Sequence, residues 1–168
     1  MTTLYLVRHG ETPDNVNMIM QGQTQGMLNE NGKRQARELA MRMKDKHLDA
    51  ILSSDLRRAI ETAEIIADGR ELNVETTPLL RERDWGGFTG KYIPSIQNAV
   101  WPNDIEGLEE LRWRASRFLD LIRERYADKS VLAVGHGIIN KAIQSVYFGR
   151  AMNEIVKMSN AEIRVLTV

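Results

Sequence analysis

The chain has 168 residues, of which 42% are hydrophobic and 27% are charged, and its 23 basic and 23 acidic side chains cancel to a formal net charge of zero. This size and composition fit one globular domain over residues 1–168 with a single substantial core. Zero net charge argues against a broad nucleic-acid-binding or membrane-attracted surface, and the lack of cysteine excludes a disulfide framework and a thiolate metal site. The first apolar run meets Arg8 too early for a signal peptide and no later run could span a bilayer, so we expect a cytoplasmic protein.

The N-terminal part of the chain predicts a strand, a long loop and a helix. Residues 4–7 form a short apolar run with the β-branched and aromatic character of a buried strand. The polar residues 12–28, rich in Asn and Gln, predict a long loop, and a long ordered loop in a compact domain usually has a function. Apolar residues at helical spacing then predict a helix over residues 30–46, with Asn29 as its N-cap.

The middle of the chain predicts two strands around a second helix, followed by a long irregular segment. The strands are expected at residues 48–52 and 73–76. Between them an apolar stripe predicts a helix over residues 56–68, for which residues 53–55 supply polar caps. Residues 80–105 carry charges, aromatic side chains, glycines and prolines without any periodicity, and we expect a loop and a short lid there.

The C-terminal part returns to regular elements. We expect helices at residues 105–127 and 138–149, and strands at residues 131–134 and 163–168. Strands that alternate with helices need crossover connections, which are almost always right-handed. The predicted fold class is therefore α/β, a three-layer sandwich with a mainly parallel sheet and helices on both faces.

Cationic side chains and histidines follow the predicted strands. Arg8 and His9 come directly after the first strand, Arg58 lies in the first turn of the second helix, and His136 follows the strand at residues 131–134. Parallel strands bring their carboxyl ends to one edge of a sheet, where helix N-termini favour an anion. Two histidines with two or three arginines at that edge predict a pocket for a tetrahedral oxyanion, and a phosphoryl group fits best.

Other interpretations of these residues stay open at this point. Arg57 shares the first helical turn with Arg58, and only the spacing of the neighbouring apolar residues selects Arg58. Glu82 lies within a run of charges that could be a surface cluster. We interpret His47 as a surface residue at a helix end. Three scattered histidines without clustered carboxylates, and a glycine-rich stretch at residues 86–90 without the context of a nucleotide loop, predict neither a metal site nor a cofactor.

Four motifs resemble those of the histidine phosphatase superfamily, the phosphoglycerate mutase-like group, and occur in that family's order over nearly the whole chain. They are Arg-His-Gly-Glu-Thr at residues 8–12, Ser-Asp-Leu-Arg-Arg-Ala-Ile-Glu-Thr-Ala at 54–63, Leu-Arg-Glu-Arg-Asp-Trp-Gly at 80–86 and Val-Gly-His-Gly at 134–137. The pattern Glu-Arg-x-aromatic-Gly within the third motif brings the chain closer to the α-ribazole phosphatase and broad-specificity phosphatase group.

The resemblance implies a role for each matching residue. His9 would be the phosphorylated nucleophile and Glu82 the proton donor and acceptor. The phosphoryl group would be bound by Arg8, Arg58 and His136, with further phosphate contacts from Asn15, Gln21, Gly22 and Gly137. These roles suit phosphoryl transfer, because a neutral imidazole can attack phosphorus when a carbonyl holds its other N–H, while a second group protonates the leaving oxygen.

The resemblance favours a metal-independent phosphomonoesterase of the histidine acid phosphatase type that acts on a small phosphorylated metabolite. The expected lid is short and the chain stops at Val168, whereas related mutases carry longer insertions and a tail over the site. A site open to water favours hydrolysis over transfer. Residues 105–109 replace the Gly-Gly-Glu-Ser turn of many relatives, so contacts made there do not carry over. The alternatives are a phosphoglycerate mutase, or a catalytically inactive module on the same fold that binds a phospho-ligand or a protein.

Overall fold

A five-stranded sheet forms the middle layer of the computed structural model, which describes residues 1–168. The strands, in the order β3-β2-β4-β1-β5 across the sheet, are β1 (Thr3–Arg8), β2 (Ala50–Ser53), β3 (Val74–Thr76), β4 (Ser130–Gly135) and β5 (Ile163–Thr167). All neighbouring strands run parallel except β1 and β5, which are antiparallel. The predicted mainly parallel sheet is confirmed.

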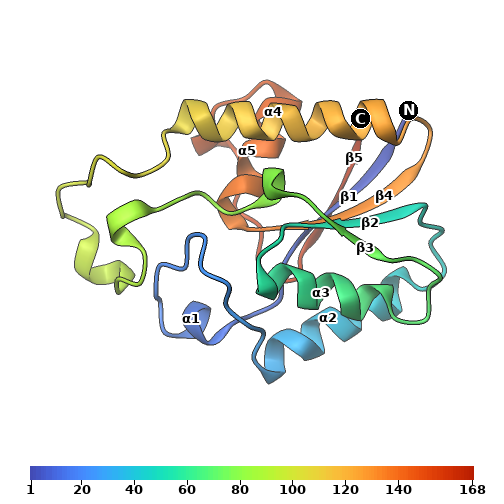
Figure 1. The fold of residues 1–168 in the computed structure, drawn as a ribbon, viewed down its shortest axis with the longest axis horizontal. Coiled ribbons are helices and arrows are strands. Elements are labelled where there is room, and N and C mark those ends of the chain that lie inside the picture. The colour runs from blue at the N-terminus through green and yellow to red at the C-terminus, as the bar shows by residue number, and fades with distance from the viewer.

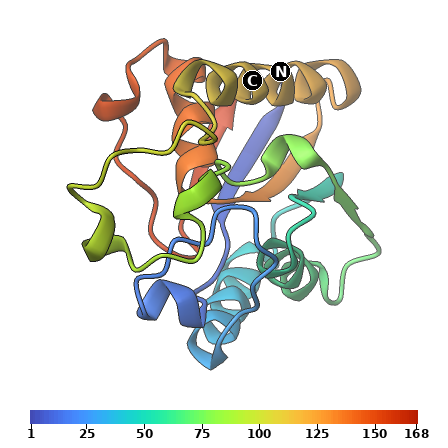
Figure 2. The same cartoon turned by 60° about the vertical axis from the view of Figure 1, so that its left-hand side comes forward.

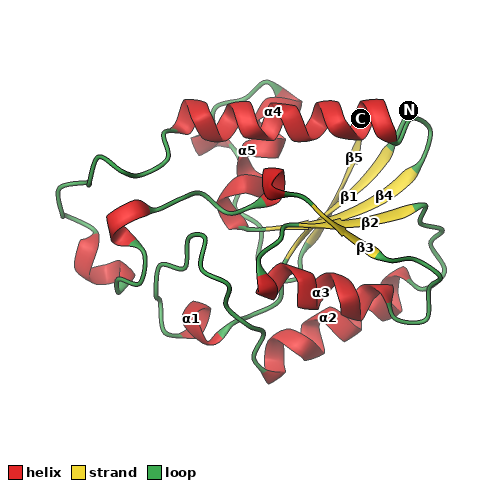
Figure 3. Cartoon of the chain, viewed as in Figure 1, coloured by secondary structure: helices red, strands yellow, loops and turns green.

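Helices cover both faces of this sheet, with α4 and α5 above it and α2 and α3 below it in the view of Figures 1 and 3. The helices are α1 (Pro13–Val16), α2 (Glu30–Met43), α3 (Arg57–Ala67), α4 (Leu108–Arg125) and α5 (Gly137–Phe148), and the single 3-10 turns are η1 (Pro78–Leu80), η2 (Gly86–Phe88), η3 (Ile93–Ile96) and η4 (Met152–Glu154). The three-layer α/β sandwich follows from this arrangement.

The core divides into two clusters, one on each face of the sheet. Side chains alternate between the faces along a strand, so Leu4 and Leu6 of β1 pack with α4 and α5, while Val7 packs with α2 and α3. The larger cluster contains Phe118 of α4, which is fully buried. Fully burying a side chain of this kind stabilises the fold by about 1.5–3 kcal/mol, so the two clusters fix the helices on the sheet and leave its carboxyl edge to the loops.

Several element boundaries differ from the sequence predictions. The long helix begins at Leu108 rather than residue 105, because the backbone N–H of Glu106 donates to the carbonyl of Asp84 and Gly107 becomes the N-cap. The helix predicted over residues 30–46 ends at Met43. The predicted long loop after β1 contains the short helix α1, whose capping box is formed by Thr12 and Asn15.

The cap predicted for α3 is wrong in its details. Leu56 occupies the N-cap position, and no side chain caps the helix. Ser54 accepts the backbone N–H of Leu56 at 3.3 Å, but its hydroxyl also lies against a histidine of the sheet edge.

None of the helices combines the length and the apolar character that crossing a bilayer requires.

Candidate active site

The carboxyl edge of the parallel strands gathers the residues that the sequence singled out. In the register of β1 and β4, Arg8 pairs with Gly135, and the backbone N–H of His9 donates to the Gly135 carbonyl at 3.1 Å. The next residue on each strand is a histidine, and the rings of His9 and His136 lie with their centroids 5.0 Å apart. Figure 2 turns this loop-bearing end of the molecule forward. His9 and His136 are 127 positions apart in the sequence, but they are neighbours in space because β1 and β4 pair side by side.

His9 is buried, with 2% of its surface exposed, and its ring is held in one orientation. Nδ1 lies 2.7 Å from the carbonyl oxygen of Gly10, so the hydrogen of the neutral ring sits on Nδ1 and the lone pair sits on Nε2. Burial, reinforced by the positive charge of Arg58, holds the pKa of His9 well below its usual value of 6.5. The ring is therefore neutral, with an unprotonated Nε2.

The turn after β1 is fixed by close backbone packing. A Cβ atom on Gly10 would lie 2.6 Å from the carbonyl oxygen of Gly32, so only glycine allows the first turn of α2 to approach this closely. The N–H of Gly10 donates to Thr62 Oγ1 at 3.1 Å, and the same hydroxyl donates to the Arg58 carbonyl at 2.9 Å. The turn that holds His9 is thereby joined to the helix that carries Arg58.

Arg58, with 1% of its surface exposed, connects His9 to the loop after α1. Its guanidinium donates to the carbonyls of Gly22, at 2.7 Å, and of Thr24, and Nε donates to His9 Nε2 at 3.3 Å. Burial lowers the pKa of Arg58 to about 10, so it remains a cation at neutral pH. Arg57 instead points to solvent, where it pairs with Glu61 at 3.6 Å. The structure thus separates the two arginines that the sequence left adjacent.

Glu82 reaches the same site from the segment after η1. Its carboxylate accepts the backbone N–H groups of Ile138 at 3.1 Å and Ile139 at 3.0 Å, in the first turn of α5, as well as that of Arg83 at 2.8 Å. Oε1 receives most of these donors. Oε2 accepts only the Ile138 N–H, which it shares with Oε1, so it has fewer donors around it than Oε1 has.

A buried ion pair holds the backbone on which Glu82 stands. Arg114 of α4 and Glu106 pair at 2.8 Å with 15% and 11% of their side chains exposed. Arg114 also donates to the carbonyls of Arg81, at 2.7 Å, and Glu82, at 3.3 Å. Glu106 accepts the N–H of Asp84 at 3.1 Å. In this chain the altered turn at residues 105–109 thus supplies a carboxylate that fixes the acidic motif.

His136 is fully buried beside His9. Ser54 Oγ lies 2.7 Å from its Nε2, and because Oγ accepts the N–H of Leu56 its own hydrogen can go to Nε2. The ring hydrogen then sits on Nδ1, a buried atom without a hydrogen-bond partner. Burial and the charge of Arg58 hold the pKa of His136 well below 6.5. His136 thus offers a neutral N–H donor.

Arg8 completes the cationic side of the site. One of its terminal nitrogens donates to the Met158 carbonyl at 2.7 Å, while its buried Nε has no partner. Burial lowers the pKa of Arg8, and the charges of Glu82 and Glu162 oppose that shift. Unpartnered N–H groups on Arg8 and His136 suit an incoming oxyanion, since buried donors without acceptors are costly.

These residues surround a cavity of about 220 Å³. Of the predicted site residues, those that line it are Arg8, His9, Asn15, Gln21, Gly22, Arg58 and Glu82. His136 and Gly137 do not line the cavity itself: His136 packs against His9, and Gly137 lies beneath the stem of Lys157. The sequence predictions missed the remaining lining residues, which are Ile19, Met20, Trp85, Ile93, Ile138 and Lys157.

Lys157 was missed because strand direction is not visible in the sequence. β5 runs antiparallel to β1 and begins beside Val7, so the residues before β5 return to the carboxyl edge of the sheet. If the direction of the last strand had been known, the segment at residues 150–162 would have been a place to look for a further cation.

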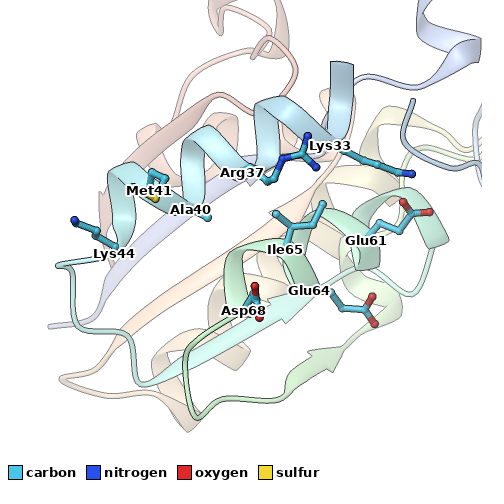
Figure 4. A pocket seen from close by; sticks show the side chains of 9 residues that line it. All are labelled: Lys33, Arg37, Ala40, Met41, Lys44, Glu61, Glu64, Ile65 and Asp68. Atoms are coloured by element: carbon cyan, nitrogen blue, oxygen red, sulfur yellow. The ribbon is translucent and has the colours of Figure 1, made fainter. Parts of the chain in front are cut away.

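A larger groove of about 740 Å³ lies between α2 and α3 (Figure 4). Basic side chains of α2 and its C-cap face acidic side chains of α3 and its C-cap across it, namely Lys33, Arg37 and Lys44 opposite Glu61, Glu64 and Asp68. It contains neither a histidine nor any residue that directly follows a strand. No group of three His, Cys, Asp or Glu side chains is placed to hold a metal ion. The residues that the sequence predicts for an oxyanion pocket therefore surround the smaller cavity and not this groove.

Comparison with known proteins agrees with this geometry. The sequence model of the histidine phosphatase superfamily (branch 1) matches residues 4–168. The chain is 40% identical over 141 residues to the uncharacterized phosphatase PhoE of Bacillus subtilis (strain 168), which covers 82% of this chain and 72% of that protein. It is 35% identical over 163 residues to the probable phosphoglycerate mutase GpmB of Yersinia pestis (strain Pestoides F), which covers 89% of this chain and 76% of that protein.

Among solved structures, Bacillus stearothermophilus YhfR has the same fold, with a TM-score of 0.90 and 30% identity over 100% of this chain and 92% of that one. The family match spans nearly the whole sequence, including all four motifs and the residues that surround the cavity. The chain therefore belongs to the histidine phosphatase superfamily, branch 1, and is a phosphatase-type enzyme.

Proposed function

We propose that this enzyme hydrolyses small phosphomonoesters through a phosphohistidine intermediate on His9, without a metal ion. The observation that carries the proposal is the neutral His9 ring, with Nδ1 held 2.7 Å from the Gly10 carbonyl and Nε2 beside the guanidinium of Arg58. A nucleophile of this kind needs no external base, and the adjacent cation stabilises the charge that develops on the phosphoryl oxygens.

In the first half of the reaction, Nε2 of His9 attacks phosphorus while the bond from phosphorus to the ester oxygen breaks. Glu82, protonated on Oε2, gives its proton to the departing oxygen, and the alcohol leaves. Arg8, Arg58 and His136 hold the three remaining phosphoryl oxygens. The Arg58 N–H that donates to Nε2 in the structure turns to one of these oxygens as the new bond forms.

In the second half, a water molecule attacks the phosphorus of phosphohistidine. The bond between phosphorus and nitrogen breaks, Glu82 takes the proton of the water, and inorganic phosphate leaves. His9 and Glu82 thereby return to their starting forms, so no co-reactant is consumed apart from water.

The test is labelling with a ³²P-phosphomonoester followed by an acid quench. We expect an acid-labile, base-stable label in the wild-type enzyme, and neither label nor p-nitrophenyl phosphate hydrolysis in His9→Ala. Activity should survive treatment with EDTA. Label on a serine or an aspartate, or loss of activity on chelation, would contradict the mechanism. Absence of both label and turnover in the wild-type protein would support the inactive binding module.

A phosphoglycerate mutase is the second candidate, because the relative GpmB carries that name. The two activities give different products from 3-phosphoglycerate. Hydrolysis releases inorganic phosphate and glycerate, whereas a mutase moves the phosphoryl group to the neighbouring hydroxyl. Product analysis by ³¹P NMR separates them, and we expect inorganic phosphate to dominate.

A further inference from the structure

Lys157 stands at the mouth of the active-site cavity, in the segment between η4 and β5. The residue is exposed, yet its side chain is one of those that line the cavity. It forms no ion pair with any carboxylate of the chain, although ten other lysine and arginine side chains do. A lysine ammonium that points into a binding cavity without a protein partner is available to a ligand.

The absence of a side chain on Gly137 makes room for Lys157. A Cβ atom at Gly137 would lie 2.5 Å from Lys157 Cε, 3.4 Å from Lys157 Nζ and 3.5 Å from the guanidinium carbon of Arg8. The lysine stem thus crosses the first turn of α5, and its ammonium and the Arg8 guanidinium flank the same point. Two cations are thus held as neighbours beside the N-terminus of α5, whose first backbone N–H groups bind the Glu82 carboxylate.

Lys157 acts less strongly on His9 than the two arginines do. Partial burial and the positive charge of Arg8 lower the pKa of Lys157, and Glu82 opposes that shift. The charges of Arg58 and Arg8 both lower the pKa of His9 more than Lys157 does, and Lys157 does not contribute to the lowered pKa of His136. Arg58 donates directly to Nε2 of His9, so the two arginines are the cations that a phosphoryl group on His9 would meet first.

The cavity is lined by one more positive charge than a phosphoryl dianion can balance when Glu82 is protonated. In the mechanism proposed above, Glu82 is protonated when the ester bond breaks. The other charged side chains that line the cavity are the cations Arg8, Arg58 and Lys157, which then face a phosphoryl dianion. A second, singly charged anionic group on the substrate would balance the third cation, which the phosphoryl group does not need.

We infer that Lys157 binds the carboxylate of the substrate, so that the enzyme prefers small phosphomonoesters that carry a carboxylate a few bonds from the ester oxygen. This inference rests on the proposed phosphatase function. A carboxylate fits better than a second phosphate because one ammonium matches one negative charge. The rest of the wall is largely apolar, from Ile19, Met20, Trp85, Ile93 and Ile138, and the whole cavity measures only about 220 Å³.

The experiment compares two esters that differ at one group. 3-Phosphoglycerate carries a carboxylate where glycerol 3-phosphate carries a hydroxymethyl group. We expect wild-type kcat/KM to be higher for 3-phosphoglycerate. Lys157→Met should lower that value by roughly fivefold to tenfold, the size of one partly exposed charged hydrogen bond, and should lower the value for glycerol 3-phosphate much less. Lys157→Arg should retain the preference and Lys157→Glu should reverse it.

Lys141→Met is the matched control, because Lys141 lies close enough to affect the charge of Lys157 but does not line the cavity. It should leave the ratio of the two kcat/KM values unchanged. Equal losses for both esters in Lys157→Met would mean that Lys157 acts on the phosphoryl group, and an unchanged ratio would mean that it binds no carboxylate. Either result overturns the inference.

Calorimetric binding of both esters to His9→Ala keeps this question separate from turnover. If the wild-type enzyme hydrolyses no phosphomonoester, the proposed function fails. Tighter binding of 3-phosphoglycerate that disappears in the His9→Ala, Lys157→Met double variant would still support the carboxylate site. Equal affinity of the two esters for His9→Ala would overturn it.

Discussion

The Nε–H group of Arg58 donates to Nε2 of His9 at 3.3 Å, in a site where both side chains are almost completely buried. Burial and this cation together keep the imidazole neutral, and in the proposed mechanism the guanidinium binds an oxygen of the attacked phosphoryl group. In the proposed mechanism this one contact both prepares the nucleophile and places the charge that stabilises the transition state.

The first prediction concerns the pH dependence of stability. The pKa values of His9 and His136 in the folded protein lie well below 6.5, their usual value in an unfolded chain. Below pH 6.5 the unfolded chain therefore binds two protons that the folded protein does not. The free energy of unfolding should fall as the pH drops from 7.5 to 5.5, by up to about 1.4 kcal/mol per pH unit for each histidine.

Urea denaturation at pH 7.5, 6.5 and 5.5 measures this slope. His9→Gln should reduce it by about half, because one of the two groups is removed. Asp55 and Glu162 have lowered pKa values in the folded protein, from 3.8 and 4.5, so their contributions are lost only at more acidic pH. An identical slope in wild type and His9→Gln would show that His9 takes up its proton without unfolding.

The second prediction separates the two adjacent arginines. Arg58→Ala should lower kcat/KM for p-nitrophenyl phosphate by on the order of 10²-fold or more, as removal of a preorganised donor does. It should also lower the melting temperature, because the carbonyls of Gly22 and Thr24 lose their donor. Arg57→Ala removes an exposed side chain and is the control, with little expected effect on either measurement. A larger loss of activity in Arg57→Ala than in Arg58→Ala would show that Arg57, and not Arg58, contacts the phosphoryl group.

The third prediction isolates the proton carried by Glu82. Glu82→Gln keeps the shape of the side chain but cannot protonate a leaving group. Alkyl phosphates, whose alkoxides leave poorly, should lose about 10²–10⁴-fold in single-turnover phosphorylation, and p-nitrophenyl phosphate far less. The variant should also accumulate phosphoenzyme from p-nitrophenyl phosphate, visible as a burst.

Asp84→Asn and Glu11→Gln are the controls for this experiment. Neither Asp84 nor Glu11 lines the cavity, and both carboxylates are engaged elsewhere: Asp84 accepts the N–H of Gly86 at 2.9 Å, and Glu11 accepts from the side chains of Asn29 and Asn31. Both variants should keep the ratio of alkyl to aryl rates. A selective loss for alkyl substrates in one of them, with Glu82→Gln unselective, would move the proton transfer to that carboxylate.

The fourth prediction concerns Ser54, whose hydroxyl lies 2.7 Å from Nε2 of His136. Ser54→Ala frees that nitrogen, so the ring can place its hydrogen on Nε2 and lose the Nδ1–H donor. We expect kcat/KM to fall roughly tenfold, the equivalent of one hydrogen bond. Ser53→Ala is a matched control, because Ser53 is equally buried and donates only to the Ser54 carbonyl. Equal effects of the two substitutions would indicate a loss of packing rather than of the His136 tautomer.

The sequence by itself determined the fold class and most of the residues at the site. Alternating strand and helix patterns required crossover connections, and these placed Arg8, His9, Arg58 and His136 at one edge because parallel strands share a direction. Local signals also set the N-cap of α2 at Asn29, whose side chain accepts the Gly32 N–H at 2.7 Å. The same kind of local signal failed at α3, where Leu56 and not a residue of 53–55 is the N-cap.

Only the tertiary structure decided the contacts between distant segments. The sequence could not show that Glu82 meets the first turn of α5, or that Arg114 and Glu106 hold it there, because those contacts join separate elements through long irregular connections. It could not place Lys157 at the cavity either, since that position depends on the antiparallel direction of β5. The periodicity of a strand reports which side chains are buried but carries no sign of the direction in which the strand pairs.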